Sequence, residues 1–469
     1  MDAGMPRFAD VQVRERVCAE LVARFGARAQ TSLASREQHS HGEGLPDSGL
    51  PDIVVFPETT AEVAAIAQLC HGARMPIVAY GAGTSLEGHV AALCGGVSVD
   101  FARMNRLLEV NVGSLDCRVE AGVTREQLNA EIRATGLFFP VDPGANATLG
   151  GMASTRASGT SAVRYGTMRE NVLGLTVVTP DGQVVRTGGR ARKSAAGYDL
   201  TRLYVGSEGT LGLVTEVQLR LYGAPEVVRA ATCQFPDVAS AVNAVIAALQ
   251  SGIPMARIEL VDAVQMGACI AYSQLTHLEA ADTLFLEFHG APAAVDEQVV
   301  ALQAISSEFG GYGYHFAEHA EDRNRLWKAR HSAYQALLAL APSRRNMGTD
   351  ACVPIDQLSA CIAETQTDIE ASGLVAAIVG HVGDGNFHVG ILFDPHDADE
   401  RGRAERLAAG VSRRAIRMGG TCTGEHGIGL HKLAAMAEEH GAAVALMRGI
   451  KQAFDPHGIM NPGKTIPTA

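Results

Sequence analysis

The stretch PDIVVFPETTAEVAAIAQLCHGARMPIVAYGAGTSLEGHVAALCGGVSVD, residues 51–100, decides the fold class. Runs rich in apolar and β-branched residues at 51–56, 75–80 and 95–100 predict strands, and the run at 58–72 predicts a helix. Strands that alternate with helices in this way are typical of an α/β unit.

A glycine-rich loop, Tyr80 to Gly88, directly follows the second of these strands. Its successive amide groups could face a pyrophosphate and form an anion-binding nest. The spacing lacks the third glycine of the GxGxxG fingerprint, which disfavours a Rossmann NAD site. Residues 144–212 are also dense in Gly, Ser and Thr, which lets backbone approach a ligand closely. The two regions together predict the wall of a cofactor site, whereas the loop alone would equally fit an ordinary turn.

Antiparallel hairpins follow the α/β stretch. Residues 106–112 and 116–123 predict one hairpin, and residues 173–179 and 183–188 predict another around Pro180-Asp181-Gly182. A chain that mixes both kinds of pairing is assigned to the α+β class.

The pattern changes again near residue 225, where we place a domain boundary. Repeated strand and helix units follow, and they predict a ferredoxin-like α/β domain over 226–415. The remaining residues, 416–469, are too few to fold independently and are expected to pack back on the first domain, 1–225.

Composition sets further bounds on the 469-residue chain. Its 39 basic and 51 acidic residues give a net charge of -12, which disfavours a nucleic-acid partner. Nine scattered cysteines without a CxxC pair predict a reducing, cytoplasmic setting. Charges within residues 1–20 argue against a signal peptide, and no segment is apolar enough to span a membrane. Peripheral membrane association through a partner remains open.

The segment HVGDGNFH, residues 381–388, carries the sharpest chemical signal. With Asp384-Gly385 as the centre of a two-residue hairpin turn, His381 would pair directly with His388 and share one sheet face. Two imidazoles in that arrangement suit one divalent metal, with zinc, manganese or iron preferred. Either histidine alone would more often be a core residue with satisfied hydrogen bonds.

The segment TGEHGIG, residues 423–429, offers a third ligand and a base. Glu425 could complete the metal site, and His426 would then point elsewhere and could act as a general base. Without the histidine pair this would be a surface loop. Arg330, on a predicted helix one turn after Trp327, could hold a substrate carboxylate through two hydrogen bonds, although alone it fits a surface arginine.

Two other motifs carry less weight. GIMNPGKT, residues 458–465, matches the P-loop pattern, but no helix can follow it, so we reject that interpretation. HExxH is absent, which argues against a zincin hydrolase.

The ordered motifs together resemble one flavoenzyme family. The glycine loop, VDPGANATLGGM, VGSEGTLG, HVGDGNFH, GTCTGEHGIG and MNPGK are similar to those of FAD-linked D-2-hydroxyacid dehydrogenases of the vanillyl-alcohol-oxidase type. The resemblance covers nearly the whole chain and is strongest to the cytochrome-linked D-lactate dehydrogenases. It implies a two-subdomain FAD-binding domain formed by the first half and the tail, with residues 226–415 as a substrate-holding cap.

The resemblance also implies roles for individual residues. His381, His388 and Glu425 would hold a zinc or manganese ion, Arg330 would bind the substrate carboxylate, and His426 would accept the hydroxyl proton. The implied residues of the FAD site, which we expect to hold the cofactor noncovalently, are Gly81, Gly83, Thr84, Ser85, Pro143, Gly144, Gly150, Gly151, Ser158, Gly209, Thr210, Asn461 and Lys464.

The implied reaction is oxidation of a D-2-hydroxy acid, such as D-lactate, to the 2-oxoacid. Cytochrome c, a quinone or an electron-transfer flavoprotein would then reoxidise the flavin. Close alternatives are a D-2-hydroxyglutarate dehydrogenase and a glycolate oxidase flavin subunit. Gly348 stands where the hydroxyglutarate enzymes have a lysine, which disfavours a dicarboxylate substrate. Two further hypotheses stay open here: a metal-dependent hydrolase and a noncatalytic flavin subunit that relays electrons.

Overall fold

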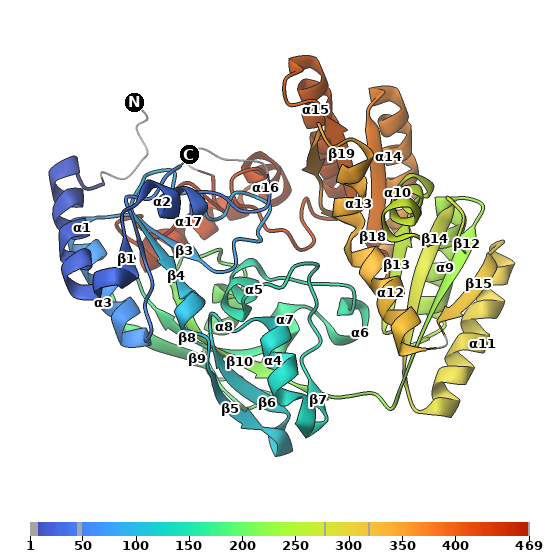
Figure 1. Cartoon of the computed structure of the whole chain (residues 1–469), viewed down its shortest axis with the longest axis horizontal. Helices are drawn as coiled ribbons and strands as arrows, with labels where there is room; N and C mark the ends of the chain where they lie inside the picture. The colour runs from blue at the N-terminus through green and yellow to red at the C-terminus, as the bar shows by residue number, and fades with distance from the viewer. Residues whose placement is uncertain (1–7, 45–48, 276–277, 318, 468–469) are drawn as a thin grey trace. The chain divides into compact units, whose positions relative to one another are not determined.

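The computed structural model describes residues 8–44, 49–275, 278–317 and 319–467, and the chain folds as two units (Figure 1). The first unit contains the chain up to Ser158, Thr167–Ala224 and the segment from Glu425 onward. The second contains Gly159–Gly166 and Pro225–Gly424. Each unit is described by itself below.

The α/β stretch forms a four-stranded sheet in the first unit, with order β1-β2-β4-β3. β2 and β3 both pair with β4 in parallel, and β1 pairs with β2 antiparallel. The elements of this layer are β1 (Ala29–Gln30), β2 (Ile53–Val55), β3 (Ile77–Tyr80), β4 (Val97–Asp100), α1 (Val11–Phe25), α2 (Leu33–Gln38) and α3 (Thr60–Ala73).

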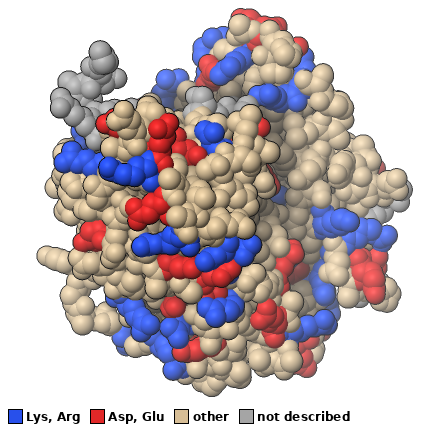
Figure 2. All heavy atoms as spheres, turned by 60° about the vertical axis from the view of Figure 1, so that its left-hand side comes forward, with Lys and Arg blue, Asp and Glu red and all other residues tan. Residues whose placement is uncertain are grey.

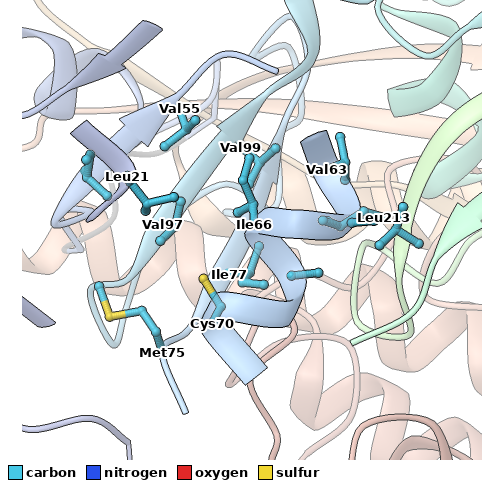
Figure 3. Close-up of a cluster of buried hydrophobic side chains, with 14 of the residues drawn as sticks. Leu21, Val55, Val63, Ile66, Cys70, Met75, Ile77, Val97, Val99 and Leu213 are labelled. Atoms are coloured by element: carbon cyan, nitrogen blue, oxygen red, sulfur yellow. The ribbon is translucent and has the colours of Figure 1, made fainter. Parts of the chain in front are cut away.

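Helix α3 forms because its sequence supplies a cap and an apolar face. The Thr59 side chain accepts a hydrogen bond from the Glu62 amide, and Val63, Ile66 and Cys70 recur at helical spacing and are buried. Figure 3 shows these side chains packed with those of the parallel strands and with Leu213 of the neighbouring sheet. This core fixes the end of β3, from which the glycine loop leaves.

The hairpins form a second, antiparallel sheet in the same unit, with order β5-β6-β10-β8-β9. β5 pairs with β6 and β8 pairs with β9, so both predicted hairpins are confirmed. The elements here are β5 (Leu107–Asn111), β6 (Asp116–Glu120), β8 (Val172–Val178), β9 (Val184–Gly188), β10 (Leu213–Arg220), the pair β7 (Leu137–Phe138) and β11 (Tyr222–Gly223), and helices α4 (Arg125–Ile132), α5 (Leu149–Thr155), α7 (Met168–Asn171) and α8 (Leu200–Tyr204).

The end of the chain belongs to the first unit. It carries α16 (Leu433–His440) and α17 (Ala443–Phe454), and then an isolated parallel bridge joins Met460 to Ile77 of β3. The amide of Ile77 donates to Ile459 O, and the amide of Asn461 donates to Ile77 O. The tail is therefore hydrogen-bonded to the strand that precedes the glycine loop.

The second unit is built on one antiparallel sheet, with order β15-β12-β14-β13-β18-β19-β16 and with β17 also paired to β19. Its strands are β12 (Val227–Phe235), β13 (Arg257–Val261), β14 (Asp282–Gly290), β15 (Tyr312–Ala317), β16 (Arg345–Gly348), β17 (Ala351–Cys352), β18 (Val375–His381) and β19 (Asn386–Phe393). Its helices are α6 (Ala162–Tyr165), α9 (Val238–Gln250), α10 (Ala263–Ser273), α11 (Pro292–Glu308), α12 (Ala320–His331), α13 (Ala333–Leu340), α14 (Leu358–Ser372) and α15 (Ala398–Arg417).

Helices α10, α12 and α13 cover the sheet face that matters for function. Their apolar side chains pack with Val261 and Phe285 in one buried cluster. Side chains two positions apart on a strand share a face, so Glu259, two residues before Val261, also points toward these helices. This face therefore combines an apolar core with buried charged groups.

All nine thiols lie within the described residues and are free. Acidic and basic side chains are interspersed on the face shown in Figure 2, so the net negative charge is not gathered into a single patch there. Among the described residues, no helix is long and apolar enough to cross a membrane.

Candidate functional site

The histidine hairpin has a different register from the predicted one. His381 pairs with Asn386, and His388 pairs with Val379, so the turn contains four residues, 382–385, instead of two. The predicted direct pairing of the two histidines is therefore wrong. Gly385 has φ +78°, and a Cβ there would lie 2.1 Å from Val353 O, so the longer turn requires glycine at this position.

The two histidines nevertheless share one face of the sheet. His388 lies opposite Val379, which is two residues from His381, and this makes the imidazoles diagonal neighbours. Their ring centroids are 5.3 Å apart in an edge-on arrangement. The expected shared face thus results from a register that the sequence did not predict.

Hydrogen bonds set the tautomer of both imidazoles. His381 Nδ1 lies 2.8 and 2.9 Å from the two carboxylate oxygens of Glu259, and His388 Nδ1 lies 3.2 Å from Thr349 O. Carboxylate and carbonyl oxygens only accept, so each Nδ1 carries a proton, and in the neutral ring Nε2 then carries the lone pair. Metal-ligating histidines commonly have this arrangement, so the pair fits a divalent ion.

Arg330 is buried on α12 and is not a surface residue. Its Nη2 donates to Glu259 Oε2 at 2.6 Å, and the residue is 6% exposed. Its Nε is buried and has no hydrogen-bond partner among the described residues. An unpaired buried N–H on a cation is suited to an anionic oxygen, such as that of a carboxylate.

The loop before Glu425 packs beside this hairpin within the second unit. Asp350 accepts from Asn386 Nδ2 at 2.8 Å and from Thr423 Oγ1 at 2.7 Å. A Cβ on Gly424 would lie 2.3 Å from Asn386 Nδ2, so the backbone approaches closely there. Glu425 is the next residue, where the chain passes into the first unit.

His426 belongs to a charged cluster of the first unit that is built around the buried Glu87. Its Nδ1 lies 3.5 Å from Glu87 Oε1, and Lys432 Nζ lies 2.9 Å from the same oxygen. His431 Nδ1 lies 3.3 Å from Glu87 Oε2. Burial opposes ionisation of Glu87, but the Lys432 ammonium and the two imidazoles outweigh it and hold the pKa of Glu87 well below its usual range. Glu87 is therefore an anion that faces the predicted base.

A second buried carboxylate fixes the turn after His426. Glu208 accepts from the amides of Ile428 at 2.7 Å and Gly429 at 2.8 Å. Gly429 has φ +48°, and a Cβ there would lie 2.0 Å from Glu87 O. The close approach of this loop to the glycine loop therefore depends on glycine.

Most of the predicted cofactor residues lie in three segments of the first unit. Gly81, Gly83, Thr84 and Ser85 follow β3. Pro143, Gly144, Gly150, Gly151 and Ser158 flank or begin α5. Gly209 and Thr210 precede β10. The Thr210 hydroxyl donates to Ser207 O at 2.6 Å and so stabilises its own loop.

Asn461 and Lys464 join these loops. The side-chain Nδ2 of Asn461 donates to Glu208 O at 2.7 Å and to His89 O at 3.1 Å. Lys464 Nζ donates to Asn461 Oδ1 at 2.6 Å and to Ala91 O. Both side chains are buried. The tail thus braces the segments that carry the glycine-rich motifs.

Comparisons with known proteins extend this description. Residues 51–188 match the FAD binding domain, and residues 224–465 match the C-terminal domain of FAD linked oxidases. A probable mitochondrial D-lactate dehydrogenase of Danio rerio is 50% identical over 437 residues, covering 92% of this chain and 88% of that protein. A mitochondrial D-lactate dehydrogenase (cytochrome) of Arabidopsis thaliana is 44% identical, covering 97% of this chain and 81% of that protein.

The chain belongs to the FAD-linked oxidases. The structure of p-cresol methylhydroxylase with substrate bound matches with a TM-score of 0.80 at 17% identity, covering 99% of this chain and 98% of that one. The fold is accordingly that of the vanillyl-alcohol-oxidase type, as the motifs predicted.

The glycine loop of this FAD-linked oxidase has a feature that fits a bound cofactor. Ser85 Oγ is buried and has no hydrogen-bond partner among the described residues. A buried hydroxyl without a partner costs free energy, and a phosphate oxygen would remove that cost. The residue type and its place after a strand thus agree with a pyrophosphate-binding loop.

Several residues of the site received no role from the sequence: Glu87, Glu208, Glu259, Asp350 and Asn386. A signal existed for two of them. Glu87 lies inside the glycine loop, and Glu259 interrupts the apolar strand ARIELVD. A charged residue on a predicted buried strand face is unusual unless it is paired, and this could have singled out Glu259.

Proposed function

We propose that this FAD-linked oxidase converts a D-2-hydroxy acid, D-lactate, to its 2-oxoacid with FAD and a divalent metal, and passes the electrons to a non-oxygen acceptor. One observation carries the proposal. In a member of this family, Arg330, His381 and His388 gather on one buried sheet face through Glu259 and the β18–β19 hairpin. A cation and two metal-ligand imidazoles together suit an α-hydroxy carboxylate.

Each residue then has one task. Arg330 binds the substrate carboxylate, with its Nε directed to a carboxylate oxygen. His426 accepts the proton of the substrate hydroxyl, and the Glu87 carboxylate beside its Nδ1 stabilises the imidazolium that forms. His381, His388 and Glu425 would hold a divalent metal.

Two groups supply chemistry that side chains lack. FAD, when bound, accepts the hydride that leaves carbon 2 of the substrate. A divalent metal, when bound, acts as a Lewis acid that lowers the pKa of the substrate hydroxyl. The loops with Gly81 to Ser85, Pro143 to Gly151 and Gly209 to Thr210 would hold FAD noncovalently, and Ser158, Asn461 and Lys464 would complete its site.

The names of two relatives and one residue favour a monocarboxylate substrate. The Danio rerio and Arabidopsis thaliana proteins are both named D-lactate dehydrogenases. Gly348, at the end of β16, offers no cation for a second carboxylate. We therefore place D-lactate ahead of D-2-hydroxyglutarate.

The acceptor and the compartment are further parts of the proposal. The Arabidopsis thaliana relative is named for cytochrome, so we propose cytochrome c ahead of a quinone or an electron-transfer flavoprotein. Both relatives are named mitochondrial. The cysteines predict a reducing, cytoplasmic setting for this chain, and we keep that setting as a second proposal.

The visible spectrum tests the reaction directly. The purified protein is scanned anaerobically before and after D-lactate, with L-lactate, glycolate and D-2-hydroxyglutarate as comparisons. We expect a flavin band that bleaches faster with D-lactate than with the three comparison acids. A flavin band that none of the acids bleaches would favour a flavin subunit that only relays electrons, and no flavin band even after FAD is supplied would overturn the proposal.

A further inference from the structure

We propose that Glu259 is a positioning residue that serves the metal site and the substrate site together. This inference rests on the proposed function, because it concerns the imidazole that would ligate the metal and the guanidinium that would bind the substrate. Glu259 itself touches neither the metal nor the substrate in this proposal. It acts through His381 and Arg330.

Glu259 is a buried carboxylate whose neighbours stabilise its charge. Its side chain is 1% exposed on β13, in the middle of the sheet. A buried carboxylate is costly unless cations and hydrogen-bond donors surround it. Oε2 accepts from Arg330 at 2.6 Å, and both oxygens lie within 2.9 Å of His381 Nδ1.

The first contact orients the metal ligand. The carboxylate accepts the Nδ1 proton of His381, which keeps the lone pair on Nε2 and restricts rotation of the ring. His388 Nδ1 lies 3.2 Å from the backbone oxygen of Thr349 and 3.6 Å from Asp350 Oδ1. Of the two imidazoles, His381 therefore has the shorter contact with a carboxylate.

The second contact orients the guanidinium. Glu259 occupies Nη2 of Arg330, while Nε has no partner among the described residues. A guanidinium is planar, so holding Nη2 restricts the directions in which Nε can point. One carboxylate thus sets the orientation of an imidazole on β18 and of a cation on α12.

A similar trio on the same sheet provides a matched control. Glu287 of β14 is 3% exposed, lies 2.8 Å from His289 Nε2 and lies 3.4 Å from Arg257 Nη1. Like Glu259, it is a buried glutamate on this sheet whose partners are a histidine and an arginine. Neither His289 nor Arg257 has a role in the proposed reaction.

The experiment compares Glu259→Gln with Glu287→Gln in the FAD-loaded full-length protein. Each variant is titrated with Zn²⁺ alone and Mn²⁺ alone against a competing chelator, and the metal-to-protein ratio is measured. We expect Glu259→Gln to bind metal about 10- to 100-fold more weakly, as for other residues that support a metal ligand. Its KM for D-lactate should rise, its FAD content should match wild type, and Glu287→Gln should bind metal like wild type.

The outcomes separate this inference from the proposed function. In one outcome, wild type holds metal and bleaches with D-lactate, and Glu259→Gln binds metal with the same affinity. This outcome leaves the proposed function standing and overturns the role of Glu259. Equal weakening in both glutamine variants also overturns it, because a general loss of sheet integrity would then suffice. Wild type that holds neither metal overturns the proposed metal site and this inference with it.

A second variant covers the case in which Glu259→Gln does not fold. Glu259→Asp keeps the charge next to the buried Arg330 but is shorter by one methylene, so it cannot reach both partners. We expect it to fold and to bind metal more weakly than wild type. Metal affinity equal to wild type in this variant would overturn the proposal.

Discussion

Glu87 and Glu259 support candidate functional histidines in two different ways. Glu259 lies on a central strand, and its partners come from the neighbouring strand and from a helix that packs on the same face. Glu87 lies in a glycine-rich loop, and its partners come from the loop and turn at 426–432. The first arrangement follows from strand register, and the second requires two irregular segments to meet.

The difference predicts what each carboxylate controls. Strand β18 and helix α12, which packs on the same sheet, hold His381 and Arg330 on either side of Glu259, which suits a metal ligand and a substrate anchor. Glu87 faces an ammonium and two imidazoles, and its pKa is low. A lasting negative charge at this position suits a neighbouring imidazole, His426, that must take and release a proton. Substitutions in the two regions should therefore have separable effects.

The largest effect is expected for His426→Asn. Without the base, anaerobic flavin reduction by D-lactate should slow by about 10²- to 10⁴-fold, while FAD and metal content stay unchanged. Stopped-flow absorbance measures the rate, and His440→Asn on α16 is the surface control. Reduction at the wild-type rate would remove His426 from the mechanism.

Substitution of a metal ligand should separate the second region from the first. We expect His388→Ala to weaken metal binding by more than about 100-fold, because a direct ligand is lost, with FAD retained. Chelator titration measures the metal, and the exposed His396→Ala serves as the control. Loss of FAD together with metal would show that the two regions are not separable in this way.

A smaller effect is expected for Glu87→Gln. The glutamine keeps an acceptor but removes the charge that stabilises a protonated His426, so flavin reduction should slow by about 10-fold. Metal affinity should not change, in contrast to Glu259→Gln. The exposed Glu438→Gln is the control, and a fall in metal affinity with an unchanged reduction rate would contradict the assignment.

How much the sequence could predict follows the same division. The strand that leads into the glycine loop and both hairpins of the first unit follow from local patterns. The shared face of His381 and His388 was expected from a two-residue turn, and the structure reaches it through a different register. The register of the β18–β19 hairpin does not follow from local patterns. Its four-residue turn packs closely against Val353, which lies outside the hairpin, and only glycine at 385 allows that approach. The partners of Glu87 come from a distant segment, and periodicity carries no information about contacts between two loops.

A third buried carboxylate sharpens the comparison, because it has backbone donors in place of cations. Asp262 accepts from the amides of Gln265 at 2.8 Å and Ile378 at 2.9 Å, and burial raises its pKa to about 7. Glu87, which faces Lys432, shifts in the opposite direction. Burial therefore decides the pKa where no cation is present, and the cation decides it where one is.

The raised pKa predicts a pH dependence of stability. Folded Asp262 binds its proton more tightly than the unfolded chain does, so its contribution is full below about pH 4 and is lost as the pH rises to about 7. Relative to Asp262→Asn, the free energy of unfolding of wild type should fall by about 1 kcal/mol per pH unit in that window. Trp327 is the only tryptophan and packs in the same cluster as Val261 and Met266, so its fluorescence in urea reports on this unit. A pH-independent difference between the two proteins would mean that Asp262 is ionised throughout, and that two amide donors can replace a cation.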